Sequence, residues 1–384
     1  MNKKSLLAAA VLSAATGLAT AADVSLYGTV DYGLFYRNQS VTVDGVKAKE
    51  HSFGLESGVG SSSLFGLTGT EDLGNGLTVG FKLENGFNAD DGALSDDAGR
   101  LFDREASLSV SGAYGTLSFG RMGGVGSSAG TYDVVYATAD AFDGGDADVL
   151  GLAISSRYDN MITYQTPVFG GLQGTFQYSF KEDSKADDER EGSAFTDRYA
   201  GAAVTGAFGP LNTVMAYEFQ NYSTAGLAAN ESVEDGHTVY LGGNFDFEVL
   251  QVFAMAQYFK GLKSKDVAFA ALDDTFAEAL DTRSEGLKGY GLHVGSVVPA
   301  AGGNLTLAAY YVDATMEQAA FGAKPADEDV SYLGFGAKYE YPLSKRTSVY
   351  TGAGYAKAKL DGSANVADGK LEVTQAYVGL THNF

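Results

Sequence analysis

From Val24 to the C-terminus, apolar and polar residues alternate with a period of two in many separate segments. One segment shows the alternation fully, with Leu77, Val79, Phe81 and Leu83 in one register and Thr78, Gly80, Lys82 and Glu84 in the other. Similar alternation occurs in 24–37, 172–181, 238–247, 332–340 and 375–384. A period of two is typical of a strand with one apolar face, so the pattern predicts an all-β protein. A soluble β-sandwich would also alternate, so the pattern alone does not place the sheet in a membrane.

Along the chain, short tight connections alternate with long ones between the alternating segments. The tight ones are predicted at 72–76, 112–115, 166–171, 208–211, 246–249, 299–304 and 341–346. The long ones are predicted at 38–50, 88–100, 122–154, 181–197, 221–236, 260–286, 313–329 and 358–370. Seven tight and eight long connections make fifteen, which gives sixteen antiparallel strands with both chain ends on the tight-turn side. This arrangement is typical of a transmembrane β-barrel with short turns at one end and long loops at the other.

Strand length and aromatic placement also favour a membrane barrel. Strands of roughly 9 to 14 residues suit a tilted crossing of the hydrocarbon layer, whereas soluble strands average about 5 to 6. Tyr or Phe stands near many strand ends, as expected for aromatic girdles: Tyr36, Phe87, Phe180, Tyr222, Phe259, Tyr311 and Tyr341. The chain ends on Phe384, in an alternating segment that suits a strand sealing the barrel. The alternatives are scattered core aromatics and a docked edge strand at the C-terminus.

The N-terminus has the composition of a secretory signal peptide. Lys3 and Lys4 precede an apolar run at 6–18, and small residues follow up to Ala22. The run is shorter than the roughly 20 residues that a transmembrane helix needs. We expect cleavage after Ala21 or Ala22, which leaves residues 23–384 as a single barrel domain.

Composition narrows the possible functions. The chain has no Cys, 51 Gly, 5 Pro and 23 each of Tyr and Phe, which favours strands over helices. Its net charge of −22 makes nucleic acid a poor partner. The four histidines, His51, His237, His293 and His382, lack the spacing of a zinc site. We expect no cofactor, no metal and no enzymatic activity.

Four short segments carry a resemblance to a known family: Val24–Val30, Gly66–Leu77, Gly115–Arg121 and Val378–Phe384. Their order and spacing resemble the trimeric general porins of Gram-negative bacteria, of the neisserial and betaproteobacterial type. The resemblance implies a homotrimer of sixteen-stranded barrels in the cell outer membrane, with periplasmic termini and a third external loop folded into each channel. It also implies contact with outer-membrane lipid and lipopolysaccharide, and recognition of the C-terminal strand by the barrel-assembly machinery, with Phe384 as the assembly signal.

In this sequence the inward loop would be 122–154, the longest connection. The resemblance implies that acids on this loop narrow and charge the channel, and the candidates are Asp133, Asp140, Asp143, Asp146 and Asp148. No Lys or Arg lies between Arg121 and Arg157, so the field on that side should be negative. The alternative is that these aspartates hydrogen-bond the loop backbone and contribute little to the field.

Five basic residues are candidates for the opposing wall. The register of the strands places Arg37, Lys82 and Arg157 toward the lumen, and Arg121 stands where a strand gives way to the loop. Arg104 matches a wall arginine of the family, yet it shares its register with apolar positions. The segment 63–69 lacks two bases that many relatives carry, and the resemblance therefore implies a stronger preference for cations than is typical.

The leading functional hypothesis is a general diffusion channel for ions and small hydrophilic solutes. A substrate-selective channel is the second hypothesis. Such a channel would typically show a ladder of lumenal aromatic residues, and the sequence does not indicate one. A closed barrel that serves adhesion is the third, and it predicts no stable conductance.

Overall fold

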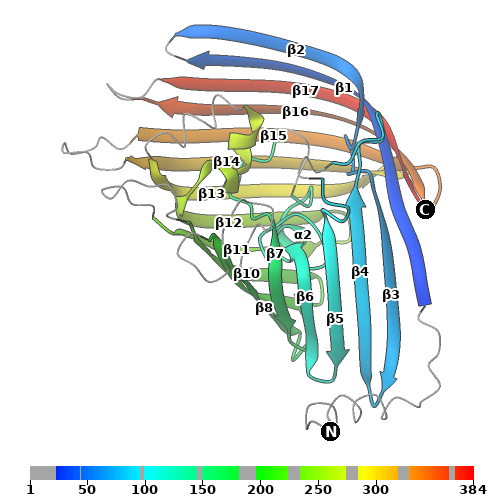
Figure 1. Cartoon of the computed structure of the whole chain (residues 1–384). Helices are drawn as coiled ribbons and strands as arrows, with labels where there is room; N and C mark the ends of the chain where they lie inside the picture. Colours follow the sequence, from blue (N-terminus) through cyan, green and yellow to red (C-terminus); the bar gives the residue numbers. More distant parts are fainter. Residues whose placement is uncertain are drawn as a thin grey trace.

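The structure is a computed structural model that describes residues 23–43, 45–95, 99–144, 149–180, 196–223, 234–273, 284–318, 328–362 and 368–384. Its strands belong to one antiparallel sheet that curls into a barrel (Figure 1). Among these residues no helix is long and apolar enough to cross a membrane.

The first half of the sheet consists of β1 (Asp23–Val43), β2 (Val46–Ser57), β3 (Leu64–Gly74), β4 (Leu77–Gly86), β5 (Glu105–Gly112), β6 (Gly115–Gly123), β7 (Arg157–Gln165) and β8 (Leu172–Ser179). The second half consists of β9 (Arg198–Phe208), β10 (Leu211–Asn221), β11 (Gly236–Asp246), β12 (Gln251–Leu262), β13 (Ser284–Ala300), β14 (Gly303–Gln318), β15 (Glu328–Pro342), β16 (Thr347–Asp361) and β17 (Gly369–Asn383). The described parts of the connections contain three short helices: α2 (Tyr136–Ala139), η1 (Ser264–Asp266) and η2 (Ala268–Leu272).

The barrel closes where the last strand meets the first. β17 pairs with β1 from Thr29 opposite Asn383 to Val43 opposite Gly369. Beyond that ladder, the Phe384 amide donates to the Gly28 carbonyl at 2.9 Å, and the Gly28 amide donates back at 3.2 Å. A Cβ atom on Gly28 would lie 2.4 Å from the Phe384 ring, so only glycine fits beneath the terminal aromatic.

The described strands number seventeen, yet they form sixteen barrel strands, because β2 and β3 follow one another along the same edge of β1. β3 pairs with residues 23–29 of β1 and β2 pairs with residues 32–43, with residues 58–63 between the two strands. The prediction of a sixteen-stranded antiparallel barrel is therefore confirmed.

One predicted loop is wrong. Residues 38–50 were expected to form a long connection, but β1 continues to Val43 and β2 begins at Val46, which leaves only two residues between them. The hairpin is polar along much of its length, so it lacks the apolar alternation that marks the other strands. All seven tight turns lie where the sequence predicts them.

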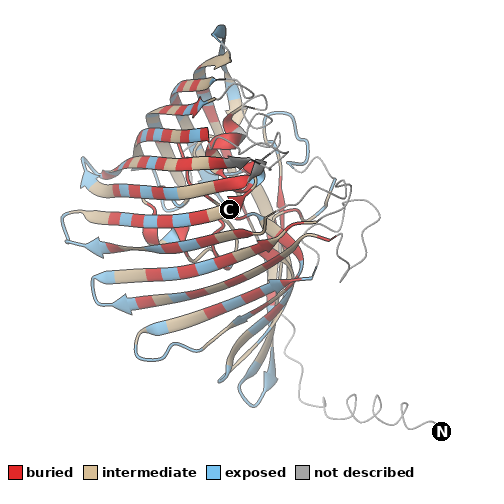
Figure 2. Ribbon diagram, turned by 90° about the vertical axis from the view of Figure 1, so that its left-hand side faces the viewer, coloured by how far each residue is buried: buried red, intermediate tan, exposed pale blue. Residues whose placement is uncertain are grey.

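Burial alternates along the strands, as the stripes in Figure 2 show. In β13 the side chains of Leu292 and Val294 are exposed on the outer face, while His293 and Gly295 are buried on the inner one. An apolar outer face with a buried or polar inner face matches the predicted transmembrane barrel.

Two of the described connecting segments lie inside the barrel. The connection between β6 and β7 carries α2, which packs against β10, β11 and β12, so the predicted inward loop is present. We call its described residues, 124–144 and 149–156, the first inward loop. The connection between β12 and β13 carries η1 and η2, and its residues 263–273 also turn inward. We call 263–273 the second inward segment, and the sequence reasoning did not predict it.

Candidate functional site

The first inward loop begins at a carboxylate in the barrel wall. Glu218 of β10 is buried and accepts hydrogen bonds from the Gly126 amide at 2.9 Å and from the hydroxyls of Tyr199 at 2.6 Å and Tyr240 at 2.7 Å. The Tyr199 hydroxyl also accepts the Val125 amide at 2.9 Å. A Cβ on Gly126 would lie 2.6 Å from a Glu218 oxygen, which explains the glycine-rich start of the loop. These bonds fix the loop against β9, β10 and β11.

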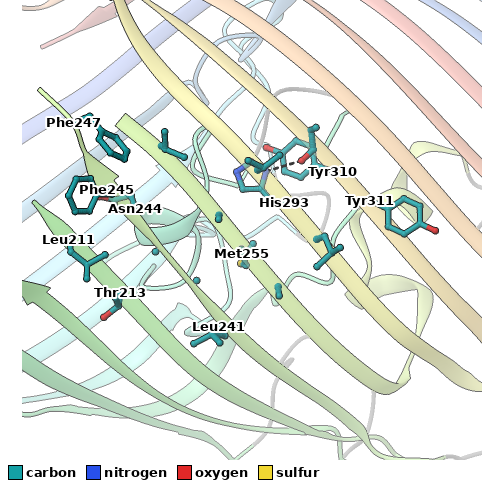
Figure 3. A pocket seen from close by; sticks show the side chains of 18 of the residues that line it. Leu211, Thr213, Leu241, Asn244, Phe245, Phe247, Met255, His293, Tyr310 and Tyr311 are labelled. Atoms are coloured by element: carbon teal, nitrogen blue, oxygen red, sulfur yellow. Dashed lines mark hydrogen bonds between the residues drawn. The ribbon is translucent and has the colours of Figure 1, made fainter. Parts of the chain in front are cut away.

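A second attachment joins the loop to β14. The Tyr310 hydroxyl donates to Asp140 Oδ1 at 2.8 Å, and His293 Nε2 lies 3.1 Å from the same oxygen. Asp140 also accepts the Gly144 amide at 2.7 Å, and only 2% of the residue is exposed. The His293 and Tyr310 rings stack with centroids 4.6 Å apart and lie side by side in Figure 3. The structure thus places Asp140 at an attachment to the wall, away from open solvent.

Two other loop acids lie close to one another. Asp143 is exposed, and Asp133 is partly buried and interacts with it through their carboxyl groups. Burial and the neighbouring Asp143 carboxyl raise the pKa of Asp133 to about 8. Partial desolvation of its carboxyl against the rest of the loop, together with the negative charge of Asp140, raises the pKa of Asp143 above its ordinary value. Asp146 and Asp148 lie outside the described residues.

The wall at β4 and β5 carries a paired set of charges. Arg104 Nε contacts Glu84 Oε1 at 2.8 Å, and Lys82 Nζ contacts Glu84 at 3.3 Å and Glu105 at 3.0 Å. The Thr131 hydroxyl, on the first inward loop, donates to Glu105 at 2.8 Å. The Arg104 side chain therefore lies in the charge cluster on the inner face. Its register in the sequence did not settle which face it would occupy.

A second group of charges lies at β6 and β7. Arg121 contacts Asp159 at 2.7 Å, and Arg100 approaches the same carboxylate at 3.7 Å. Arg157 lies within electrostatic range of Arg104 and Arg121, and its side chain makes no hydrogen bond or ion pair within the described part of the chain. Four of the five predicted wall bases thus gather in one region of the wall.

Arg37, the fifth base, has a different position. Its guanidinium donates to the Leu272 carbonyl at 3.0 Å, and Gln39 donates to Asp273 at 2.7 Å. Both contacts connect β1 to the end of the second inward segment. Since that segment leaves the wall at β12, it crosses the interior to reach β1.

The two inward segments are joined to one another. The Ile154 amide donates to the Asp266 carbonyl at 3.0 Å, and the Ala268 amide donates to the Leu152 carbonyl at 2.9 Å. Ala153 and Val267 form an isolated β-bridge between these bonds. The second inward segment therefore holds residues 152–154, where the first inward loop runs back toward β7.

Apolar side chains fill the space between these segments and the long strands. Phe269 of the second inward segment is fully buried, and its ring centroid lies 5.7 Å from that of Tyr332. The inner wall residues in this cluster include Val312, Ala314, Met316, Val330, Ala358, Leu360, Leu371 and Val373. The interior is thus apolar and packed beside β14 to β17, and charged beside β4 to β7.

Sequence reasoning missed the acids that pair with the wall bases and the carboxylate that anchors the loop. Glu84 shared the inward register of Lys82, so its position could have been found. Asp159 shares the register of Arg157, and Glu105 shares that of Ser107 and Ser109, so both offered the same signal. Glu218 shares its register with Val214 and Ala216 and offered none. In the described residues no cluster of three or more acids or histidines could hold a metal ion.

Comparison with known proteins agrees with this architecture. Residues 8–362 match the model of the Gram-negative porin family. The chain is 34% identical to an outer membrane porin protein of Bordetella pertussis over 100% of both chains, and 26% identical to major outer membrane protein P.IA of Neisseria meningitidis over the same share. It is similar in structure to an anion-selective porin from Comamonas acidovorans, with a TM-score of 0.62 and 25% identity over 95% of this chain and 100% of that one.

The fold is a closed barrel with a loop attached across its interior, and the sequence agrees with porins along its whole length. The chain belongs to the Gram-negative porin family and is an outer-membrane β-barrel channel protein.

Proposed function

We propose that the protein is a general diffusion channel that lets ions and small hydrophilic solutes cross the outer membrane passively. The first inward loop carries the proposal, because hydrogen bonds attach it to the inner wall at Glu105, Glu218 and Tyr310, on β5, β10 and β14. A loop held at three separated strands lies across the interior and narrows it, which is what a size-limiting constriction requires. Family membership points to a channel and not to an enzyme.

We further propose a mild preference for cations. The charges of the first inward loop and of the wall beside β4 to β7 comprise the acids Asp133, Asp140, Asp143, Glu84, Glu105, Asp159 and Asp103, whose carboxylate accepts the Gly86 amide at 2.7 Å, and the bases Lys82, Arg100, Arg104, Arg121 and Arg157. Seven acids minus five bases leave an excess of two negative charges when Asp133 is ionised, and of one while Asp133 holds its proton. Rings of charge select ions through their field, so this excess favours cations. The similar porin from Comamonas acidovorans is described as anion-selective, so measurement has to decide the sign.

We propose that three copies assemble through the short wall of the barrel. β5 and β8 have 8 residues each, whereas β15, β16 and β17 have 15. At roughly 3.3 Å per residue and about 45° of tilt, eight residues rise about 19 Å, less than the apolar band of about 25 Å. A wall this short is better covered by protein than by lipid, which supports the expected homotrimer.

The remaining expectations concern export and assembly. We propose that residues 1–22 direct secretion and are removed, and that both termini face the periplasm. Phe384 seals the barrel seam against Gly28, which supports its role as the assembly signal read by the barrel-assembly machinery.

Liposome swelling with a series of neutral sugars, combined with single-channel recording, tests the proposed function. A general diffusion channel should give stepwise currents and swelling rates that fall smoothly with solute size. Fast entry of one sugar class alone would favour the substrate-selective channel. Folded protein that inserts without conductance would favour the closed-barrel adhesin.

A further inference from the structure

His293 of β13 lies between the barrel wall and the first inward loop, with an oxygen atom near each nitrogen of its ring. Nδ1 lies 3.2 Å from the Ala309 carbonyl oxygen on β14, and Nε2 lies 3.1 Å from Asp140 Oδ1 on the loop. Both oxygens accept hydrogen bonds, and a neutral imidazole ring has only one N–H group to donate. His293 therefore donates to both oxygens only when it is doubly protonated and positively charged.

Nε2 also has a partner that suits the neutral ring. The Ala141 amide lies 3.4 Å from this nitrogen and donates to it, which requires an Nε2 atom without a proton. In that state Nδ1 carries the proton and donates to Ala309, while the Asp140 carboxylate faces the lone pair of Nε2. Uptake of one proton replaces the Ala141 hydrogen bond with an ion pair between His293 and Asp140.

The neighbours of the ring hold it against the loop. The His293 and Asp140 side chains are both fully buried, and the Tyr310 ring stacks on the imidazole with centroids 4.6 Å apart (Figure 3). Gly295 follows on the same face of β13, where a Cβ atom would lie 2.6 Å from Ala141 Cβ and 2.9 Å from the His293 ring. The loop, the ring and the strand thus approach closely, so a change in the charge of the ring acts directly on the loop.

The charge that faces His293 comes from the loop. Among the described residues, Asp140 is the charged group that acts on the imidazole. β14 adds the Tyr310 hydroxyl, which donates to the same carboxylate oxygen at 2.8 Å, and β12 adds the uncharged Met255 directly opposite the histidine. Three further charged side chains act on the loop around Asp140 and not on the imidazole: Asp133, Asp143 and Lys338. The protonation of His293 is therefore coupled to Asp140.

We propose that His293 is a pH-sensitive attachment point for the first inward loop. In the charged form its ion pair with Asp140 adds to the Tyr310 hydrogen bond and holds the loop firmly against β13 and β14. In the neutral form the ion pair is lost, and the buried carboxylate keeps only uncharged partners. Because opposite charges attract strongly in a buried site of low dielectric, the two forms differ in how firmly the loop is held.

The direction of the pH effect follows from the charge of the ring. A histidine in ordinary surroundings changes its charge between about pH 5 and 8. The ion pair is present at the acidic end and is lost as the pH rises, so the loop should be held most firmly in acid and loosen toward alkaline pH. The consequence for the current rests on the proposed channel function, whereas the protonation of His293 does not.

NMR tests the exchange of partners without any need for conductance. The folded protein in detergent micelles is labelled at histidine and alanine, and the signals are assigned by their loss in His293→Gln and in Ala141→Gly. We expect the His293 ring to gain a proton as the pH falls, and the Ala141 amide signal to shift with the same midpoint, because this amide loses its acceptor. A His293 ring that keeps one protonation state, or an Ala141 signal that does not follow it, would overturn the proposal.

Single-channel recording in symmetrical KCl tests the effect on the loop. Asp133→Asn/Asp143→Asn serves as the background, so that this carboxyl pair does not titrate. Brief increases in conductance mark loosening of the loop, and we expect them to become more frequent from acidic to alkaline pH by on the order of tenfold. Adding His293→Gln, which can still donate to Asp140 but carries no charge, should abolish this pH dependence. The matched control is His237→Gln, which should preserve it, because His237 lies on the outer face of β11 and bonds Tyr217.

The recordings contradict the proposal in two cases. One is a frequency of these events that stays constant with pH in the background variant, and the other is a pH dependence that persists after His293→Gln. Folded protein without conductance would contradict the proposed function, and the shift of the Ala141 amide would then decide the proposal by itself.

Discussion

The hydroxyl of Tyr310 donates a hydrogen bond of 2.8 Å to the carboxylate of Asp140, and this bond joins the first inward loop to strand β14. The two residues are 170 positions apart in the sequence. Asp140 is buried here and its other oxygen accepts the Gly144 amide, so the residue both attaches the loop and shapes its turn.

Tyr310→Phe should loosen the loop while leaving every charge in place. Loss of a donor to a buried carboxylate costs about 1.5–3 kcal/mol, which is enough to free a local attachment. We expect a noisier open channel with a larger mean conductance in single-channel records. Tyr311→Phe is the matched control, because Tyr311 lies on the same strand and is exposed on the outer face. If Tyr310→Phe leaves the current noise and the mean conductance unchanged, the attachments at Glu218 and Glu105 are sufficient to hold the loop.

Phe269→Ala should release the second inward segment. The Phe269 ring is fully buried against Tyr332, and removal of a buried aromatic ring costs about 3–5 kcal/mol. Because this segment holds the return of the first loop, we expect a higher conductance and faster entry of larger sugars. Phe176→Ala, at an exposed position on the outer face, serves as the control and should leave both unchanged. Conductance equal to that of the natural protein in Phe269→Ala would contradict the proposed dependence of the first loop on this segment.

The inward turn of the second inward segment was not predicted from the sequence. The run from Val267 to Leu272 is wholly apolar, yet it falls in a predicted long connection and was not interpreted. Its packing partners are the inner positions of β14 to β17, which are apolar where a water-filled barrel would be polar. Both signals are present in the sequence, but only the closed barrel brings them together.

Selectivity should depend on pH between about 6 and 9. Burial and the neighbouring Asp143 carboxyl raise the pKa of Asp133 from 3.8 to about 8, so Asp133 is mostly protonated at pH 6. Above pH 8 it loses its proton and adds a negative charge to the loop, and cation preference should therefore rise. Asp143→Asn removes the neighbouring charge but leaves Asp133 buried, so it lowers the pKa of Asp133 and should move the rise to lower pH. A reversal potential that stays flat with pH in the natural protein would exclude this pair from the ion path.

Arg157→Gln should increase cation preference. The Arg157 guanidinium has no hydrogen-bond or ion-pair partner in the described residues, so its positive charge is not balanced by a contacting acid. Arg121→Gln is the comparison, because Arg121 pairs with Asp159 at 2.7 Å and its removal also exposes a negative charge. Both variants should shift the reversal potential toward cations, and Arg157→Gln should do so without loss of thermal stability. An unchanged reversal potential in Arg157→Gln would place this guanidinium outside the ion path.

Arg157 also shows why the barrel was easier to predict than its charges. Strand number and turn positions follow from alternation and glycine-rich turns, which are local. The register that places Arg157 toward the lumen would put its neighbour Tyr158 on the outer face, but Asn160 has a left-handed backbone with φ of 52°, and the pairing of β6 with β7 shifts between Gly120 and Met122. Tyr158 packs with Tyr199 in the interior as a result. The residue types at these positions do not predict such a bulge from the sequence.

The most direct test of the account is the reversal potential of single channels in a tenfold KCl gradient at pH 7.5, compared between the natural protein and Asp133→Asn/Asp143→Asn. We predict reversal on the cation side for the natural protein and a shift toward zero in the variant. Reversal on the anion side in the natural protein would contradict the account, because the wall bases Lys82, Arg104, Arg121 and Arg157 would then outweigh the acids of the loop.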